Sequence, residues 1–464
     1  MEADSKSSRD VQSLLLADAT TLAGMLAREE ISSVELTTVC LQAIEHRNPQ
    51  LNCYLHIDAG GAIAAAQASD ARRAAGVPLS IFDGLTFAVK DNIDVAGMPT
   101  SNGLGYGAHA PRADRDAAVV AELRAAGMIP LGKLNMHEIA LGATNDNYHW
   151  GRCENPLREG YTPGGSSGGS GAAVAAGLCA LALGTDTMGS VRIPASYCGV
   201  AALKPGRGQW SLDGVTRLSH VLDSVGLLAR SGRDLQALWK LPPVSHLPRA
   251  EEQAVLSLQT MRFAAMTLDS ASDLDQEILT AFAQATSALA GQTASLEARD
   301  CIGMDFSGVR RAGLLMCEAE ANVTFADELA QGQLFSLQLR KMLRWGAEQP
   351  APALVRAQDT VQAAGEWLAQ KLEGVDFLLT PTTPQAAFPF SEPAPVNQAN
   401  LTSYVNMAGL AATSVPLGVT ADGLPFGLQV IARAGDEQRL LAASVALENF
   451  LRATSAHTQD LENH

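Results

Sequence analysis

Residues 162–171 read Thr-Pro-Gly-Gly-Ser-Ser-Gly-Gly-Ser-Gly, and residues 184–194 read Gly-Thr-Asp-Thr-Met-Gly-Ser-Val-Arg-Ile-Pro. Glycine at this density weakens helices and strands, because its backbone loses more conformational freedom on folding than that of any other residue. It is therefore expected where the backbone must follow a constrained path. Each loop also presents serine, so together they indicate hydroxyl chemistry beside backbone N–H groups, as in nucleophile and oxyanion sites.

Two other uses of such a loop are weighed against this one. A flexible linker is disfavoured because the apolar, alanine-rich run 171–183 follows directly, and this run predicts a buried helix. A phosphate-binding P-loop ends in Gly-Lys-Ser/Thr, whereas the single Gly-Lys pair, Gly132-Lys133, continues with Leu134. From the loop residues alone, a catalytic loop and a structural turn both remain open.

A lysine at the end of an apolar segment adds a third element. Residues 85–89 (Leu-Thr-Phe-Ala-Val) predict a short buried strand, and Lys90 follows it. Lysine is rarely buried without a partner. Lys90 therefore either forms a surface pair with Asp91 or Asp94, or is a desolvated lysine whose lowered pKa lets it act as a base.

Taken together, these segments resemble the amidase signature family. The resemblance is carried by Lys90 in Val-Lys-Asp-Asn-Ile-Asp, by Ser166 in Gly-Gly-Ser-Ser-Gly-Gly-Ser, and by Ser190, 24 residues later, in Gly-Thr-Asp-Thr-Met-Gly-Ser-Val-Arg-Ile-Pro-Ala. Further matches lie at residues 132–138, 198–200, 203–205, 379–384, 406–410 and 423–429. The resemblance runs from about Leu15 to about Leu451, nearly the whole chain.

The resemblance implies one large α/β domain over residues 1–464, with a core of about 15–451 in which helices cover both faces of a twisted mixed β-sheet. Alternating helical and short apolar segments up to about Gly232 agree with an α/β core. Helices are expected over 14–30, 33–47 (with Ser32 or Ser33 as N-cap), 59–76, 117–126 and 437–451, and strands over 128–132, 376–380, 414–418 and 427–431. Residues 235–375 are expected to be mostly helical, to cover the pocket and to select the substrate.

The resemblance also implies a mechanism. Amide hydrolysis needs a nucleophile, a proton route to the leaving nitrogen and a group that stabilises the oxyanion. Ser190 is the implied nucleophile and Ser166 the implied proton relay. Lys90 is the implied base, neutral at rest because of burial and a hydrogen bond to Ser166. The Gly165–Ser166 peptide bond is expected to be cis.

The backbone N–H groups of Thr187, Met188, Gly189 and Ser190 are expected to form the oxyanion hole. Met188 departs from the family's usual glycine. Its N–H remains a donor, since every residue except proline supplies one. The side chain of Met188 is expected to line or narrow the pocket, so substrate size depends on it.

Four residues beside these motifs have expected or open roles. Ala140 and Gly142 align with backbone positions that bind the acyl group in family members. Asp186 and Arg192 flank the nucleophile and either form a structural ion pair or contact the substrate.

Histidine is an alternative base. His137 or His149 could complete a Ser-His-Asp arrangement, but the lysine motif already supplies a base, which disfavours this alternative. His137-Glu138 lacks the second histidine of a zinc-binding helix. No metal and no other cofactor are therefore predicted.

Composition and charge indicate which binding partners and which cellular compartment are expected. The 464 residues are 47% apolar and 18% charged, as in a globular enzyme with a sizeable core. A net charge of −16 disfavours nucleic acid or an anionic membrane as a direct partner. Seven scattered cysteines, the lack of a signal-peptide pattern and the lack of an apolar run of ~20 residues predict a cytoplasmic location.

Two enzymatic functions fit this sequence. One is a stand-alone amidase that releases ammonia or an amine from a small linear carboxamide. The other is the glutamine-hydrolysing component of an amidotransferase complex, which supplies ammonia to a partner acting on charged tRNA. Both use the same serine and lysine residues. A catalytically silent binding protein is a third class, which the intact motif disfavours. The substrate stays open, and a homodimer is a family-level expectation.

Overall fold

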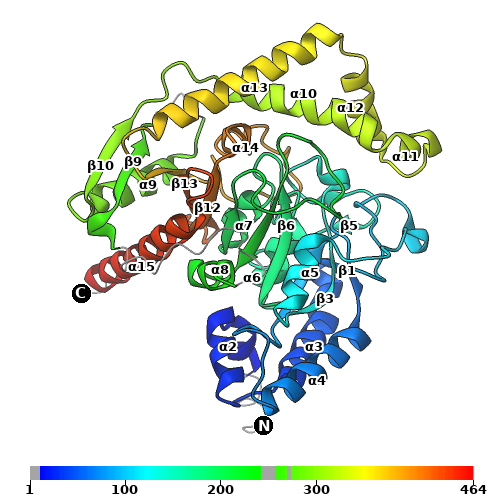
Figure 1. The fold of residues 1–464 in the computed structure, drawn as a ribbon. Coiled ribbons are helices and arrows are strands. Elements are labelled where there is room, and N and C mark those ends of the chain that lie inside the picture. The colour runs from blue at the N-terminus through cyan, green and yellow to red at the C-terminus, as the bar shows by residue number, and fades with distance from the viewer. Residues whose placement is uncertain (1–10, 242–256, 269–272, 463–464) are drawn as a thin grey trace.

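The computed structural model describes residues 11–241, 257–268 and 273–462 (Figure 1). Eleven strands form its central sheet: β1 (Tyr54–Ile57), β2 (Thr86–Lys90), β3 (Ile129–Leu134), β6 (Leu181–Asp186), β7 (Ala201–Lys204), β8 (Ser224–Ala229), β9 (Arg262–Met266), β10 (Ser295–Arg299), β11 (Phe377–Pro381), β12 (Ala411–Val419) and β13 (Pro425–Ala432). Their order across the sheet is β1-β3-β2-β6-β8-β7-β12-β13-β11-β9-β10. One sheet therefore joins segments from residue 54 to residue 432.

The sheet is mixed. β2 runs parallel to both β3 and β6, and β9 runs parallel to both β10 and β11. The strands between these two groups, from β6 to β11, pair antiparallel. A separate two-stranded ribbon joins β4 (Asp146–Asn147) and β5 (Gly151–Arg152). The carboxyl ends of β2 and β6 therefore meet at one edge of the sheet.

Helices cover both faces of the sheet, as predicted. They are α2 (Ala19–Ala27), α3 (Ser33–Leu51), α4 (Ala59–Ala74), α5 (Ala118–Ala125), α6 (Gly168–Ala175), α7 (Arg192–Cys198), α8 (Gly232–Trp239), α9 (Gln276–Leu289), α10 (Phe306–Thr324), α11 (Ala326–Gln331), α12 (Leu337–Ala347), α13 (Ala351–Lys371), α14 (Ser403–Met407) and α15 (Glu437–Glu462). Adjacent residues of a strand point to opposite faces. In β12, Thr413 shares a hydrogen bond of 2.7 Å with Ser444 of α15, whereas Ser414 bonds to Thr382 at 2.8 Å on the other face.

Two short helices lie inside the molecule. Every residue of α7 is buried, as are residues 168–174 of α6. A helix that is apolar or small on all sides fits only where neighbours cover it completely. In α6, a Cβ on Gly169 would lie 2.4 Å from the carbonyl oxygen of Asn135, so only glycine allows this close approach.

Helices α10, α12 and α13 form an outer layer, here called the cap, which arches over α14 and the sheet (Figure 1). A second apolar cluster lies beneath it, to which Met316, Leu343, Leu368, Tyr404 and Met407 contribute. The cap therefore rests on the same side of the molecule as the loops that follow β6.

Two predicted elements were wrong in detail, and the prediction for a third section was incomplete. The run 171–183 is not one helix, because α6 ends at Ala175 and β6 begins at Leu181. Between them Gly177 has a φ of 74°, a left-handed conformation that ends helices. Alanine and leucine suit both elements when fully buried, so periodicity does not separate them.

The described parts of section 235–375 are mostly helical, as predicted, but they also contain two strands, and residues 242–256 and 269–272 lie outside the described residues. The two strands, β9 and β10, extend the sheet beyond β11. Ala264, Ala265 and Met266 favour helix by intrinsic propensity, but here β9 pairs parallel with β11, with Phe263 opposite Phe377. The tertiary pairing outweighs the local preference.

The helix expected over 14–30 is interrupted. The Asp18 side chain accepts the Thr21 N–H at 3.0 Å and starts α2 afresh at Ala19. The prediction of a cap at Ser32 is confirmed, since Ser32 and Glu35 form a reciprocal capping box at the start of α3.

Candidate active site

Three segments distant in sequence meet where β2 and β6 end. Lys90 is the last residue of β2, and the loop after β6 carries Ser190. Ser166 lies just before α6, and its carbonyl accepts the His137 N–H at 3.1 Å. The Gly165–Ser166 peptide bond is cis, as expected. Because β2 and β6 pair in parallel, Lys90 at the end of β2 lies beside the end of β6, which follows the Ser166 loop in the sequence.

Lys90 is fully buried and directed at Ser166. Its Nζ donates to Ser166 Oγ at 2.7 Å, to Thr185 Oγ1 at 2.8 Å and to the Thr185 carbonyl at 3.4 Å. Burial lowers the pKa of Lys90 to about 7, and the charges of Asp223 and Asp186 oppose this shift. The alternative of a surface pair with Asp91 or Asp94 is therefore wrong.

Two other buried lysines show what is particular to Lys90. Burial lowers the pKa of Lys204 to about 7 as well, but its Nζ donates to the Pro205 carbonyl at 2.7 Å. Lys133 lies 3.4 Å from Asp91 and donates to Thr100 Oγ1 at 2.9 Å. A lowered pKa alone thus does not identify a base, whereas contact with a hydroxyl of the glycine-rich serine loop distinguishes Lys90.

The loop after β6 places Ser190 at the wall of a cavity. Its side chain is partly exposed, and its carbonyl accepts the Ser167 N–H at 3.1 Å, which ties the two glycine-rich loops together. Within the described residues, Ser190 Oγ has no hydrogen-bond partner, and no bond joins it to Ser166 Oγ. The nucleophile candidate is thus held by its backbone and is free at its hydroxyl.

The structure changes the expectation for one oxyanion donor. The Gly189 N–H donates to Asp186 Oδ1 at 2.7 Å, so it is already engaged and does not line the cavity. The N–H groups of Thr187, Met188 and Ser190 have no hydrogen-bond partner in the described part of the chain. Glycine is needed at position 189 for two other reasons. Its φ is 126°, and a Cβ there would lie only 2.2 Å from Thr402 Oγ1.

Asp186 and Arg192 form a structural ion pair beneath the loop. Both are fully buried, and Arg192 Nε and Nη2 contact the two carboxylate oxygens at 3.0 and 2.9 Å. Burial by itself would raise the pKa of Asp186, but the Arg192 charge and hydrogen bonds hold it well below its usual value. Asp186 also accepts the N–H groups of Gly189 and Val191, so the pair fixes the loop.

Two residues from the C-terminal half complete this network. Arg192 donates to Asn406 Oδ1 and to Gln429 Oε1, each at 2.6 Å. Asn406 in turn donates to the Asp186 carbonyl at 2.9 Å. Both residues lie in segments that resemble the family, but the sequence did not indicate their role. Their hydrogen bonds to Arg192 now show that they hold the ion pair.

The cavity beside Ser190 has a volume of about 180 Å³. Its wall from the strand-end loops, here called the strand-end wall, consists of residues 140–143, Thr187, Met188, Ser190 and Ile193. The remaining wall, here called the cap wall, consists of Arg310, Leu314 and Met342 from the cap and of Val396, Gln398 and Ala399 from the loop before α14, and Leu218 completes the lining. The predicted Ala140, Gly142, Thr187 and Met188 thus lie around one cavity with Ser190. The cap-wall residues were not found from the sequence, since no motif marks them.

Met188 bridges the two walls. A Cβ on Gly313 of α10 would lie 2.8 Å from the Met188 sulfur, so the cap helix approaches this side chain closely. A glycine at 313 makes room for the methionine at 188. The side chain therefore occupies volume at the cavity, as expected from the sequence.

A larger hollow of about 690 Å³ borders this cavity and shares Leu141 and Met342 with it. Aromatic side chains from Tyr148, Phe388 and Phe390 line it, together with acidic and basic groups. This hollow offers space beyond the small cavity for part of a ligand.

The histidines occupy other positions. Burial lowers the pKa of His137 to about 4, and its Nδ1 lies 3.4 Å from Thr144 Oγ1. His149 lies 3.6 Å from Glu138. Neither histidine contacts Ser190, so the structure does not support a Ser-His-Asp arrangement.

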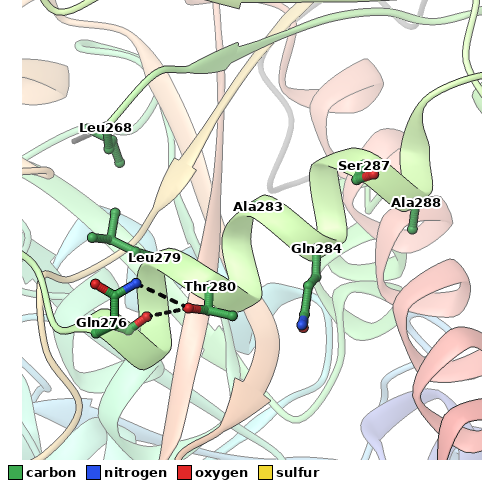
Figure 2. A pocket seen from close by; sticks show the side chains of 8 residues that line it. All are labelled: Leu268, Gln276, Leu279, Thr280, Ala283, Gln284, Ser287 and Ala288. Carbon is green, nitrogen blue, oxygen red and sulfur yellow. Dashed lines mark hydrogen bonds between the residues drawn. The ribbon is translucent and has the colours of Figure 1, made fainter. Parts of the chain in front are cut away.

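A separate surface pocket of about 820 Å³ lies along α9 (Figure 2). Its eight lining residues carry no ionisable side chain, and Thr280 Oγ1 within it is occupied by Gln276 at 2.8 and 3.3 Å. This composition offers no acid or base, so the Ser287 and Thr280 hydroxyls have no activating group among the lining residues.

Three further properties concern the described ranges only. They contain no group of three or more His, Cys, Asp or Glu side chains arranged to hold a metal ion. None of their helices combines the length and apolar character needed to cross a bilayer. All seven cysteines lie in these ranges and none forms a disulfide.

Comparisons with known proteins show which family the chain belongs to. A family model described as Amidase matches residues 35–441. A glutamyl-tRNA(Gln) amidotransferase subunit from Chloroflexus aggregans is 33% identical, over 94% of this chain and 96% of the relative. A crystal structure of an amidase has a TM-score of 0.85 at 29% identity, covering 93% and 99% of the two chains. A peptide amidase in complex with chymostatin has a TM-score of 0.79 at 28% identity, covering 94% and 98%. The chain belongs to the amidase signature family of hydrolases.

Proposed function

We propose that this enzyme hydrolyses the C–N bond of a small linear carboxamide through an acyl-enzyme on Ser190 and releases ammonia or an amine. The observation that carries the proposal is the contact of 2.7 Å between Lys90 Nζ and Ser166 Oγ, next to a cavity lined by Ser190. A lysine with a pKa of about 7 is substantially neutral at neutral pH and can accept a proton.

In the proposed acylation, Ser190 Oγ attacks the amide carbonyl carbon and gives up its proton to Ser166, whose own proton passes to Lys90. The N–H groups of Thr187, Met188 and Ser190 stabilise the negative oxygen that develops. The C–N bond then breaks as the proton returns through Ser166 to the leaving nitrogen. Catalytic hydrogen bonds often tighten only when substrate is bound, which accounts for the unpaired Ser190 hydroxyl.

Deacylation uses the same groups. A water molecule takes the place of the departed amine, gives its proton to the Ser166–Lys90 relay and attacks the acyl carbon. The ester bond to Ser190 Oγ breaks, the hydroxyl regains the proton, and a carboxylic acid leaves. Each step needs Lys90 to alternate between its neutral and protonated forms, for which a pKa near 7 is suited.

The cavity supports a small acyl group. Its volume of about 180 Å³ lies below the roughly 300–1,000 Å³ of pockets that hold drug-sized ligands. The adjoining larger hollow leaves room for a bigger leaving group.

A second candidate function is favoured by the relatives named as glutamyl-tRNA(Gln) amidotransferase subunits. In that case the chain would hydrolyse glutamine and deliver ammonia to a partner chain. The proposed chemistry at Ser190 is the same, so the two candidates differ in substrate and in their dependence on a partner.

Ammonia release by the purified chain alone tests the proposal. The panel contains small aliphatic and aryl amides, biuret and glutamine, and the Ser190→Ala variant serves as blank. We expect release from one or a few of the amides, absent in the variant. Equal release by Ser190→Ala would contradict the proposal. Release from glutamine only when a partner is added would favour the second candidate.

A further inference from the structure

The cap wall of the Ser190 cavity contains one ionisable side chain. Arg310 lies on α10, and it is the one charged residue among those that line this cavity. Its Nε donates to Asn400 Oδ1 at 3.0 Å, which fixes the orientation of the guanidinium. Among the described residues, neither Nη1 nor Nη2 has a hydrogen-bond acceptor, and no carboxylate lies within ion-pair distance. Both NH2 groups of the guanidinium therefore remain available in the cavity that Ser190 lines.

The surroundings disfavour an unpaired charge at this position. Arg310 is partly buried, and burial together with the charge of Arg311 lowers its pKa. The rest of the cap wall is apolar except for Gln398. A guanidinium in such a place is costly unless an anion pairs with it. Within the described chain no such anion is present, so the missing partner is best supplied by a ligand.

Gln398 provides a second, independent observation. It is 5% exposed, and its Nε2 donates to the Pro395 carbonyl at 3.0 Å. Its Oε1 is buried without a hydrogen-bond partner in the described structure. A buried acceptor left unpaired is rare and destabilising. An N–H of a bound ligand would satisfy it. The cap wall thus contains a positive charge without an anion and a hydrogen-bond acceptor without a donor.

We propose that the substrate is a small amide that also carries a carboxylate, and that Arg310 binds this carboxylate while Ser190 attacks the amide at the other end. The proposal rests on the proposed function and specifies its substrate class. The planar fork of two N–H groups matches the two oxygens of a carboxylate. The cavity volume of about 180 Å³ fits a molecule whose amide and carboxylate are separated by few carbons. Half-amides of short dicarboxylic acids are the simplest compounds of this class.

Matched substrate pairs test the proposal. Malonamate, succinamate and glutaramate carry the carboxylate, and 3-methylbutanamide, 4-methylpentanamide and 5-methylhexanamide replace it with an uncharged isopropyl group of similar size. We expect the best acid to exceed its neutral isostere in kcat/KM. In Arg310→Met, kcat/KM for the acid should fall about 10- to 100-fold, the effect of losing a charge-assisted hydrogen bond. The isostere should change less than about threefold, since it makes no such bond.

Two further variants separate a binding role from a structural one. Arg310→Lys keeps the charge but not the fork, and should restore part of the preference for the acid. Arg311→Met is the matched control, because Arg311 is the exposed neighbour on the same helix and is not part of the cavity wall. It should leave the acid preference unchanged. An equal loss for acid and isostere in Arg310→Met, with Arg310→Lys behaving alike, would overturn the proposal.

Binding to Ser190→Ala distinguishes failure of the proposal from failure of the proposed function. Calorimetry with this variant measures the affinity of the proposed carboxylate subsite for the acids, because the variant does not hydrolyse them. Tighter binding of an acid than of its isostere, lost in Ser190→Ala/Arg310→Met, supports the carboxylate subsite even if no amide is hydrolysed. Equal or weaker binding of every acid overturns the proposal, and hydrolysis of neutral amides would still leave the proposed function in place.

Discussion

The two walls of the Ser190 cavity differ in how their polar groups are satisfied. Behind the strand-end wall, the Asp186 carboxylate accepts from five donors, and Lys90 Nζ has three acceptors. On the cap wall, Arg310 and Gln398 each retain groups without partners in the described chain. The protein thus holds the groups of the proposed chemistry with its own residues, whereas on our proposal the unpaired groups of the cap wall bind a ligand. Chemistry and specificity are assigned to different parts of the fold.

The largest expected effect concerns the base. Lys90→Ala should lower kcat about 10²- to 10⁴-fold, the usual contribution of a positioned general base. Steady-state ammonia release measures it. Lys240→Ala, an exposed lysine that follows α8, is the control and should keep the wild-type rate. A near-normal rate in Lys90→Ala would show that Lys90 is not the base. The strand-end wall could then no longer be regarded as the source of the proposed chemistry.

The ion pair behind the strand-end wall should matter for stability. Arg192→Met leaves the Asp186 charge buried and unpaired, which should cost about 3–5 kcal/mol of the free energy of unfolding. Urea denaturation followed by circular dichroism measures it. Arg344→Met is the comparison, because Arg344 pairs with Glu348 at 2.8 Å on the exposed face of α12 and its loss should not be measurable. Similar midpoints for the two variants would show that the buried network does not hold the loop.

Met188 joins the two walls, so its removal should alter specificity more than chemistry. Met188→Gly enlarges the cavity, and amides with one additional methylene should gain about tenfold in kcat/KM relative to shorter ones. The rate with the shortest good substrate should stay within a few-fold of wild type. A uniform loss across chain lengths would instead indicate that Met188 supports the loop and does not set substrate size.

The smallest expected effect is a shift in pH dependence. The Asp223 charge favours the protonated form of Lys90, opposing desolvation. A neutral lysine is the active base, so kcat/KM should rise with pH through the pKa of Lys90, about 7. Asp223→Asn removes the opposing charge, lowers the pKa of Lys90 further and should move this rise to lower pH. Asp213→Asn, at an exposed position, should leave the profile unchanged. A rise displaced to higher pH would contradict the proposed base.

The sequence predicted the strand-end wall better than the cap wall for a physical reason. Glycine and serine loops that pack against other segments without room for a Cβ leave a local pattern, as at Gly169 and Gly189. Arg310 and Gln398 reach the cavity only because α10 and the loop near 398 fold over it, and no local pattern marks such positions. β9 was not predicted for the same reason, because its strand conformation depends on pairing with β11, which is distant in the sequence. The hydrogen bond from the Gly189 N–H to Asp186 was not predicted either, because sequence spacing carries no information on where the Asp186 side chain points.

Partitioning of an acyl group tests the central claim most directly. The primary amide and the N-methyl amide of one acid are hydrolysed in the presence of hydroxylamine, and the ratio of hydroxamate to acid is measured for each. If both substrates pass through the same acyl-enzyme on Ser190, the ratio should be identical for the two leaving groups, and Ser190→Ala should form neither product. A ratio that depends on the leaving group, or hydrolysis without any hydroxamate, would contradict the account.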